Sequence, residues 1–94
     1  MPRYSLDGDR LVNFVRRGRS RWKDFEVERV VRKRSKQVIF LRAQGSRVKL
    51  IVYFDGRVRA YGDLDGVAYA VKRIAERVLG LDRHAGRASR EANQ

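Results

Sequence analysis

The sequence predicts an α+β fold, in which a four-stranded antiparallel β-meander is flanked by an N-terminal and a C-terminal helix (α-β-β-β-β-α). Apolar residues recur at helical spacing in two segments, one near the start of the chain and one near residue 70. Between them, residues 25–62 show strand-like periodicity. This stretch is interrupted only by short polar or glycine-bearing segments, which are typical of hairpin loops and therefore of consecutive antiparallel strands.

The first predicted helix spans residues 9–17, DRLVNFVRR. Asp7 or Asp9 can cap its start, and Gly18 can end it as the left-handed residue that often follows a helix. Residues 19–23, RSRWK, then form a predicted basic connector. The apolar stripe of this helix consists of Leu11, Val12, Phe14 and Val15.

The four predicted strands are residues 25–33, 37–43, 47–53 and 57–62. A second helix is predicted over residues 64–79, with Asp63 as a candidate N-cap and Gly80 as its end. Its apolar stripe is made by Val67, Val71, Ile74 and Val78. We therefore predict one domain over residues 1–80. A polar tail over residues 81–94 has too few apolar residues to fold by itself.

The loop around Asp55-Gly56 decides which side chains of residues 47–61 share a face. A two-residue turn would mix core and basic side chains on one face. A three-residue loop over 54–56, with Gly56 in the left-handed bulge position, gives one face that is entirely apolar. A slip of one residue would reverse every side chain, so we predict the three-residue loop. The apolar face then holds Val48, Leu50, Val52, Val58 and Ala60.

The same test predicts a four-residue loop, residues 44–47, which sets Arg42 opposite Lys49. The apolar face then also receives Ile39, Leu41 and Ala43. In the first strand the valines do not fit one alternation, and a bulge near Arg29 would restore it.

The opposite face of the predicted sheet combines aromatic, apolar and basic side chains. Bases of single-stranded nucleic acid stack on such rings while arginines follow the phosphates, so this face is a candidate binding site. Whether the helix over residues 9–17 covers this face or borders it as the wall of a cleft stays open. The candidate residues are Phe40, Ile51, Tyr53 and Tyr61, with Val38 beside them, and a rim of Arg42, Arg47, Lys49, Arg57 and Arg59.

The composition favours a polyanionic partner. The formal net charge is +12, with 18 arginines and 5 lysines among the 94 residues, and such self-repulsion is relieved by binding an anion. Arginine is also the better forked ligand for phosphate. We expect no catalytic residues, no metal and no cofactor, because cysteine is absent and the single histidine, His84, lies in the polar tail. We expect a cytoplasmic protein without a membrane partner, and the heavy charge would suit a thermophile.

Two features remain open between a binding role and a structural one. Trp22 could stack on a base or could fill the junction between the first helix and the sheet. The run RKRSK, residues 32–36, is a basic hairpin tip that is either solvated or contacts phosphate.

In element order and face chemistry, the chain resembles the archaeal single-stranded DNA-binding proteins called ThermoDBP and their shorter relatives. The likeness is carried by QVIFLR, RVKLIVYFDGRVRAY and VAYAVKRIAERVL. It implies a four-stranded sheet with flanking helices that form a cleft for exposed bases. By this likeness Phe40, Ile51, Tyr53 and Tyr61 would line the cleft, and Arg42, Lys49, Arg57 and Arg59 would lie at its edge. The coiled-coil extension of the longer members has no counterpart after Gly80, since no heptads follow it.

The leading hypothesis is therefore a largely sequence-independent single-stranded DNA-binding protein. The alternatives are an RNA-binding module, such as a component like those of the signal recognition particle, and a homodimeric structural or regulatory protein that uses the same face. The sequence allows a monomer or a homodimer. A nuclease would need metal ligands that the sequence does not assemble.

Overall fold

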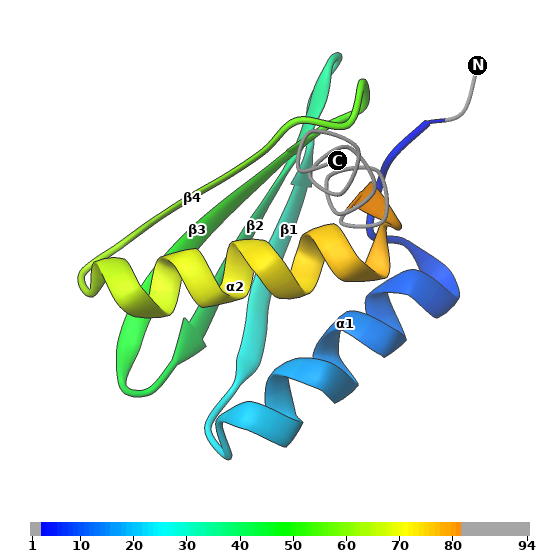
Figure 1. Cartoon of the computed structure of the whole chain (residues 1–94). Helices are drawn as coiled ribbons and strands as arrows, with labels where there is room; N and C mark the ends of the chain where they lie inside the picture. Colours follow the sequence, from blue (N-terminus) through cyan, green and yellow to red (C-terminus); the bar gives the residue numbers. More distant parts are fainter. Residues whose placement is uncertain (1–2, 82–94) are drawn as a thin grey trace, which may run out of the picture.

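A computed structural model describes residues 3–81 and has the predicted order of helix, four strands and helix (Figure 1). The predicted tail over residues 81–94 lies, apart from Leu81, outside the described residues, as does His84. The strands form one antiparallel sheet in the order β1-β2-β3-β4. The elements are α1 (Gly8–Arg21), β1 (Glu26–Arg32), β2 (Lys36–Ala43), β3 (Ser46–Tyr53), β4 (Val58–Gly62) and α2 (Asp65–Val78).

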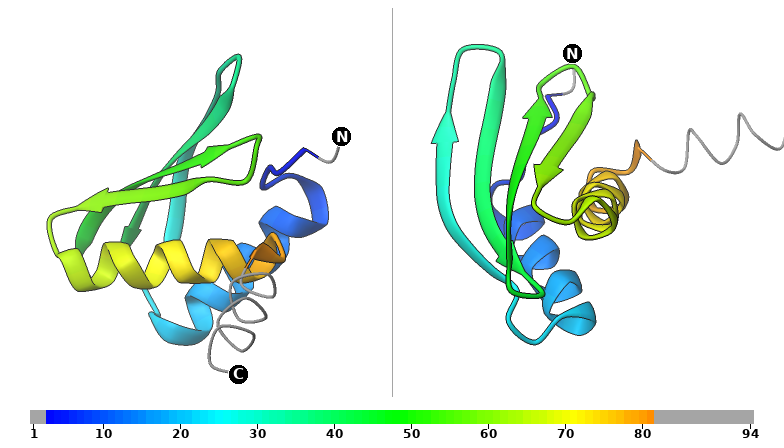
Figure 2. Two further views of the ribbon diagram at one scale, coloured as in Figure 1. Left: turned by 45° about the horizontal axis from the view of Figure 1, so that its top comes forward. Right: turned by 90° about the vertical axis from the view of Figure 1, so that its left-hand side faces the viewer.

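Both helices lie on the same face of the sheet, as the right-hand view of Figure 2 shows. α2 packs on β3 and β4, and α1 packs on α2 and on β1. The core between the two layers contains the apolar face that the alternation predicted, and Ala60 lies half-buried at its border. Its sheet side consists of Ile39, Leu41, Ala43, Val48, Leu50, Val52 and Val58.

α1 is longer than predicted, because Gly18 does not end it. Gly18 is buried inside the helix, where the ring of Phe25 packs against its Cα. Residues 19–21 are therefore helical and not part of a connector, and Trp22 is the C-cap. The predicted stripe is also partly wrong, because Val12 is 58% exposed whereas Phe14 is fully buried.

The three-residue loop between β3 and β4 is confirmed. Tyr53 N–H donates to the Arg57 carbonyl at 2.8 Å, and Gly56, with φ of 108°, donates to the Tyr53 carbonyl. The pairs Ile51↔Arg59 and Lys49↔Tyr61 follow as predicted.

The predicted four-residue loop between β2 and β3 is wrong. The strands are joined by a two-residue turn at Gln44-Gly45, both with positive φ, so that Arg42 faces Arg47 and not Lys49. The carboxylate of Asp24 accepts the backbone N–H groups of both turn residues, at 2.9 and 2.7 Å, and holds this turn. The register is shifted by two residues, an even number, so every side chain stays on its predicted face.

β1 has the bulge that its valines required, between Val27 and Arg29. The bulge restores the alternation, since Arg29 pairs with Phe40 and Val31 with Val38. The predicted capping of the helices is wrong in detail. Asp7 is the N-cap residue of α1, one of the two residues predicted, but Leu64 rather than Asp63 precedes α2, and neither helix has a side-chain cap hydrogen bond.

Candidate nucleic-acid interface

The face of the sheet opposite the helices, here called the open face, is not covered by any described element. α1 neither covers it nor forms a cleft with it, because α1 packs beside α2 on the other side (Figure 2). The registers place thirteen side chains on the open face. They are Arg29 and Val31 of β1, Lys36, Val38, Phe40 and Arg42 of β2, Arg47, Lys49, Ile51 and Tyr53 of β3, and Arg57, Arg59 and Tyr61 at β4.

Phe40 stands at the centre of this face between two shallow hollows. One, of about 450 Å³, is also lined by Arg47, Lys49 and Tyr61, and by the acidic residues Glu28 and Asp63. The other, of about 370 Å³, is also lined by Arg29 and Lys49. Phe40 is 36% exposed and Tyr61 is 51% exposed, so both rings are accessible to a planar ligand. Each hollow therefore has an aromatic wall and at least two cations.

Arg42 and Arg47 lie directly opposite each other on the open face. Like charges in such a pair destabilise a sheet. Glu28 of the bulge partly neutralises Arg42, with 3.8 Å between its Oε2 and Nη2 of Arg42. Arg47 forms no ion pair with any residue of the described range. An anion above this pair would relieve the repulsion.

Tyr53 differs from Phe40 and Tyr61 because two cations of the protein already lie against its ring. The guanidinium of Arg57 lies 4.4 Å from the ring centroid and the ammonium of Lys36 lies 5.7 Å from it. Asp55 holds Arg57 in turn, with 3.1 Å between Oδ2 and Nε. The backbone N–H of Arg57 and then its guanidinium lower the pKa of Asp55, so this carboxylate stays ionised. Tyr53 therefore positions two cations and does not present a free ring.

Arg59 of β4 lies near the side chains of Tyr61, on the same strand, and Tyr53, on β3. A hydrogen bond with the Tyr61 side chain raises the pKa of Arg59 above its already high ordinary value. Arg59 and Tyr61 are two residues apart on β4, so this cation and this ring lie on the same face, at the β4 side of the open face.

Of the predicted site residues, only Trp22 lies elsewhere. Its ring stacks on Phe25 at 6.1 Å between centroids and packs against the core, on the side of the helices. Of the two roles considered for Trp22, its position thus fits the structural one, in which the ring fills the junction between α1 and the sheet. Ile51 is on the open face but only 7% exposed, so it forms the floor of the site.

Arg29 and Lys36 were not among the predicted site residues. Arg29 reaches the open face only because of the bulge, and local alternation could suggest a bulge without fixing its position. Lys36 was assigned to the basic hairpin tip, but it is the first residue of β2, opposite Tyr53.

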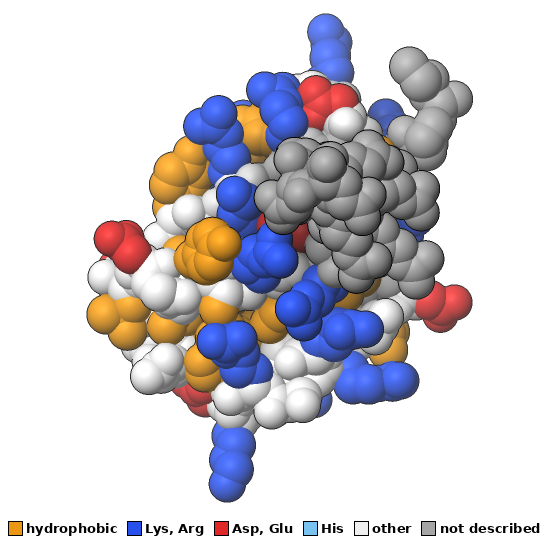
Figure 3. All heavy atoms as spheres, viewed as in Figure 1, with side chains coloured by type: hydrophobic (Ala, Val, Ile, Leu, Met, Phe, Trp, Pro, Cys, Tyr) orange, Lys and Arg blue, Asp and Glu red, His pale blue; other side chains and the backbone are white. Residues whose placement is uncertain are grey.

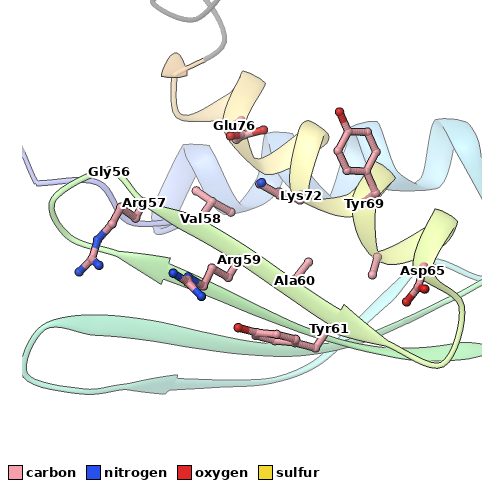
Figure 4. Close-up of a pocket in the computed structure, with 11 residues that line it drawn as sticks. Gly56, Arg57, Val58, Arg59, Ala60, Tyr61, Asp65, Tyr69, Lys72 and Glu76 are labelled. Carbon is pink, nitrogen blue, oxygen red and sulfur yellow. The ribbon is translucent and has the colours of Figure 1, made fainter.

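A third hollow, of about 650 Å³, lies at the outer edge of β4, and Arg57, Arg59 and Tyr61 of the open face also line it. Figure 4 shows Val58 and Ala60 pointing from β4 toward α2, and Arg59 and Tyr61 pointing to the opposite side. On α2 it is lined by both signs of charge, Asp65, Lys72 and Glu76, together with Tyr69. Two carboxylates face one ammonium group here, so the α2 wall of this hollow does not favour an anion.

The fold and the open face define a two-layer α+β domain with a bare, basic and aromatic sheet surface. Compared with protein-family models, with curated proteins and with solved structures, the chain gives no match. The resemblance to ThermoDBP therefore stays a prediction. Within residues 3–81, no helix has the length and apolar character needed to cross a membrane, and no three potential metal-ligating side chains come together.

Proposed function

We propose that the protein binds single-stranded DNA on the open face, with little sequence preference. The observation that carries this proposal is the position of Phe40 and Tyr61, two exposed rings that share one hollow with Arg47 and Lys49. Stacking on an aromatic ring contributes about 1–3 kcal/mol per base and tolerates any base. The neighbouring cations can contact the phosphates between stacked bases.

The charge of the face supports a polyanion over an apolar partner. Arg42 and Arg47 oppose each other in the absence of a ligand, and Lys49 is exposed beside them. A second copy of the chain would bring the same cations against one another, since each carries the same net charge of +12. This argues against a homodimer through the open face.

Single-stranded RNA is the second candidate. A four-stranded antiparallel sheet with helices on one side and exposed aromatic residues on the other is also how RNA recognition modules stack two or three bases. The rings and cations of the open face can stack on and pair with either kind of strand, so the two ligands are separated by measurement.

The test is fluorescence anisotropy with single-stranded DNA, the same sequence as RNA, and duplex DNA, at two salt concentrations. We expect single strands to bind more tightly than duplex. We also expect the logarithm of the affinity to fall with the logarithm of the salt concentration, with a slope of about 0.7 per phosphate contact. Equal or tighter binding of the duplex would contradict stacking on the open face, and preference for the RNA would favour the second candidate.

The matched variants are Phe40→Ala/Tyr61→Ala and Tyr69→Ala. Tyr69 is 62% exposed on α2 and does not belong to the open face, so it controls for the loss of an exposed ring. We expect the double variant to lose single-strand affinity by a factor of roughly 30 or more, as two lost stacking contacts imply. Tyr69→Ala should bind as the parent protein does.

A further inference from the structure

The helices carry a second set of cations that the open face does not use. Figure 3, which views the molecule from the helix side, shows Lys and Arg side chains spread over α1 and α2. In α1 the only acidic residue is Asp9, in its first turn. The cations are Arg10, Arg16, Arg17, Arg19 and Arg21 on α1, and Lys72, Arg73 and Arg77 on α2.

Some of these cations converge on a hollow of about 370 Å³ between the two helices. Arg17 and Arg21 are one helical turn apart and therefore project from one side of α1. Arg77 reaches the same hollow from the last turn of α2, and Ser20 adds a hydroxyl group. Ile74, which is 8% exposed, completes the lining that residues 3–81 provide, and none of these lining residues is acidic.

The helix dipole does not account for this arrangement. Basic residues in the last turn of a helix are stabilised by its dipole. This explains Arg21 in α1 and Arg77 in α2, but not Arg17, which lies one turn earlier in α1. The carboxylate of Glu76 is directed to Arg73, with 3.7 Å between Oε1 and Nη1. Arg21 lies over the ring of Trp22, at 5.1 Å from its centroid, which positions the guanidinium without neutralising it. Converging guanidinium groups with a hydroxyl group are the chemistry that binds a phosphate.

We propose that this hollow binds the phosphodiester backbone of a second nucleic-acid segment, so that one protein molecule bridges two strands. The inference rests on the proposed function of the open face, which lies on the other side of the sheet. Among residues 3–81, no aromatic side chain lines the hollow, so the second segment is held by its phosphates and independently of its sequence. Because one protein molecule would hold two strands, it should bring strands together even when the protein is less concentrated than the strands.

The test uses two oligothymidylates, one with a donor dye and one with an acceptor dye. Each is about 10 nucleotides long, which is near the length that one sheet site holds. These strands cannot pair with each other, so energy transfer reports bridging by the protein. The variant is Arg17→Gln/Arg21→Gln. The control is Arg10→Gln/Arg16→Gln, which removes the same charge from the same helix but leaves the hollow intact. Circular dichroism checks that both variants fold.

With the parent protein and the control we expect energy transfer at substoichiometric protein. With Arg17→Gln/Arg21→Gln we expect its loss, while affinity for one short strand stays within about threefold, because that strand occupies the open face. If the parent protein binds the oligonucleotides but gives no energy transfer, the second site is refuted and the proposed function of the open face is not. Undiminished energy transfer in the variant would also overturn it, because two associated protein copies would then hold the strands. No binding of a single oligonucleotide at all would instead refute the proposed function, and the bridging inference with it.

Discussion

The ring of Phe25 occupies the space that any side chain at Gly18 would need. A Cβ atom built on Gly18 would come within 2.4 Å of Cε1 of Phe25. Phe25 is 1% exposed and makes an edge contact with Phe14, with 5.4 Å between ring centroids, so the ring cannot move without opening the core. This contact fixes how closely the end of α1 approaches the start of β1.

We expect Gly18→Ala to destabilise the protein although alanine favours helices. Overpacking a core costs about 1–3 kcal/mol, against a gain in helix propensity of about 1 kcal/mol. Gly66→Ala in α2 is the control, because its Cβ would meet nothing within 4 Å. That variant should be more stable by about 0.5–1 kcal/mol. Urea unfolding of both measures the difference, and a stabilised Gly18→Ala would contradict the packing role.

Gly18 also illustrates why part of the fold could not be predicted from the sequence. A glycine after a basic turn is typical of a helix end, and only the packed position of the Phe25 ring, outside the helix, shows that Gly18 is a packing position. The turn at Gln44-Gly45 is similar, because its partner Asp24 lies about twenty residues earlier in the chain. By contrast, the loop before Arg57 could be predicted, since only one loop length gave an apolar face.

The candidate site could be predicted in part for the same reason. Alternation alone places Phe40, Lys49 and Tyr61 on one face of the sheet, and a register shift of two residues leaves that face unchanged. Which face α1 covers depends on its contacts with α2, and no local pattern encodes such contacts. The occupation of Tyr53 by Lys36 and Arg57 is likewise a property of the assembled sheet.

Gln37 ties the N-terminal segment to the sheet. Its fully buried amide accepts the Leu6 N–H at 2.9 Å and donates to the Leu6 carbonyl at 3.0 Å. Gln37→Leu would leave both backbone groups buried and unpaired, at a cost of about 1–3 kcal/mol each. We expect a lower unfolding midpoint and loss of hydrogen-exchange protection at the Leu6 amide. Retained protection there would show that other groups replace the amide.

Asp24 should make stability depend on pH through the β2–β3 turn. The backbone N–H groups of Gly45 and Gln44 lower the pKa of Asp24 below its ordinary value of 3.8. Its contribution is therefore complete above pH 3.8 and is lost as the pH falls through the folded-state pKa. We expect Asp24→Ala to lower the melting temperature at neutral pH and to approach the parent in strong acid.

The comparison is thermal unfolding of parent, Asp24→Ala and Asp63→Ala across this range. Asp63 accepts no hydrogen bond from any residue in the described part of the chain, so its loss controls for the charge. The parent also loses stability in acid through Asp7 and Asp55, whose pKa values are lowered too. The prediction therefore concerns the difference between parent and Asp24→Ala. A difference that persists unchanged in acid would count against it.

Tyr53 and Phe40 should respond differently to truncation if bases stack on the open face. We expect Phe40→Ala to cost about 1–3 kcal/mol of single-strand binding, the contribution of one stacked base. Tyr53→Ala should cost less, because the ring is already occupied by Arg57 and Lys36, which remain available to phosphates. Anisotropy titrations compare the two, and a larger loss for Tyr53→Ala would make Tyr53 the stacking residue.

We expect Arg47 to lower the stability of the free protein and to strengthen its binding of single strands. It faces Arg42 across the strands and has no ion pair among the described residues. Arg47→Gln removes a like-charge pair, and opposed pairs in sheets contribute about 0.2–1 kcal/mol, so the free protein should become slightly more stable. The same change should weaken single-strand binding and lower the salt slope by about 0.7, the value for one phosphate contact. Arg10→Gln on α1 is the control for net charge and should leave that slope unchanged for a short strand. Replacing a residue that only supports the fold would not combine higher stability with weaker binding. If Arg47→Gln loses stability, or keeps the full salt slope, Arg47 does not belong to the binding site.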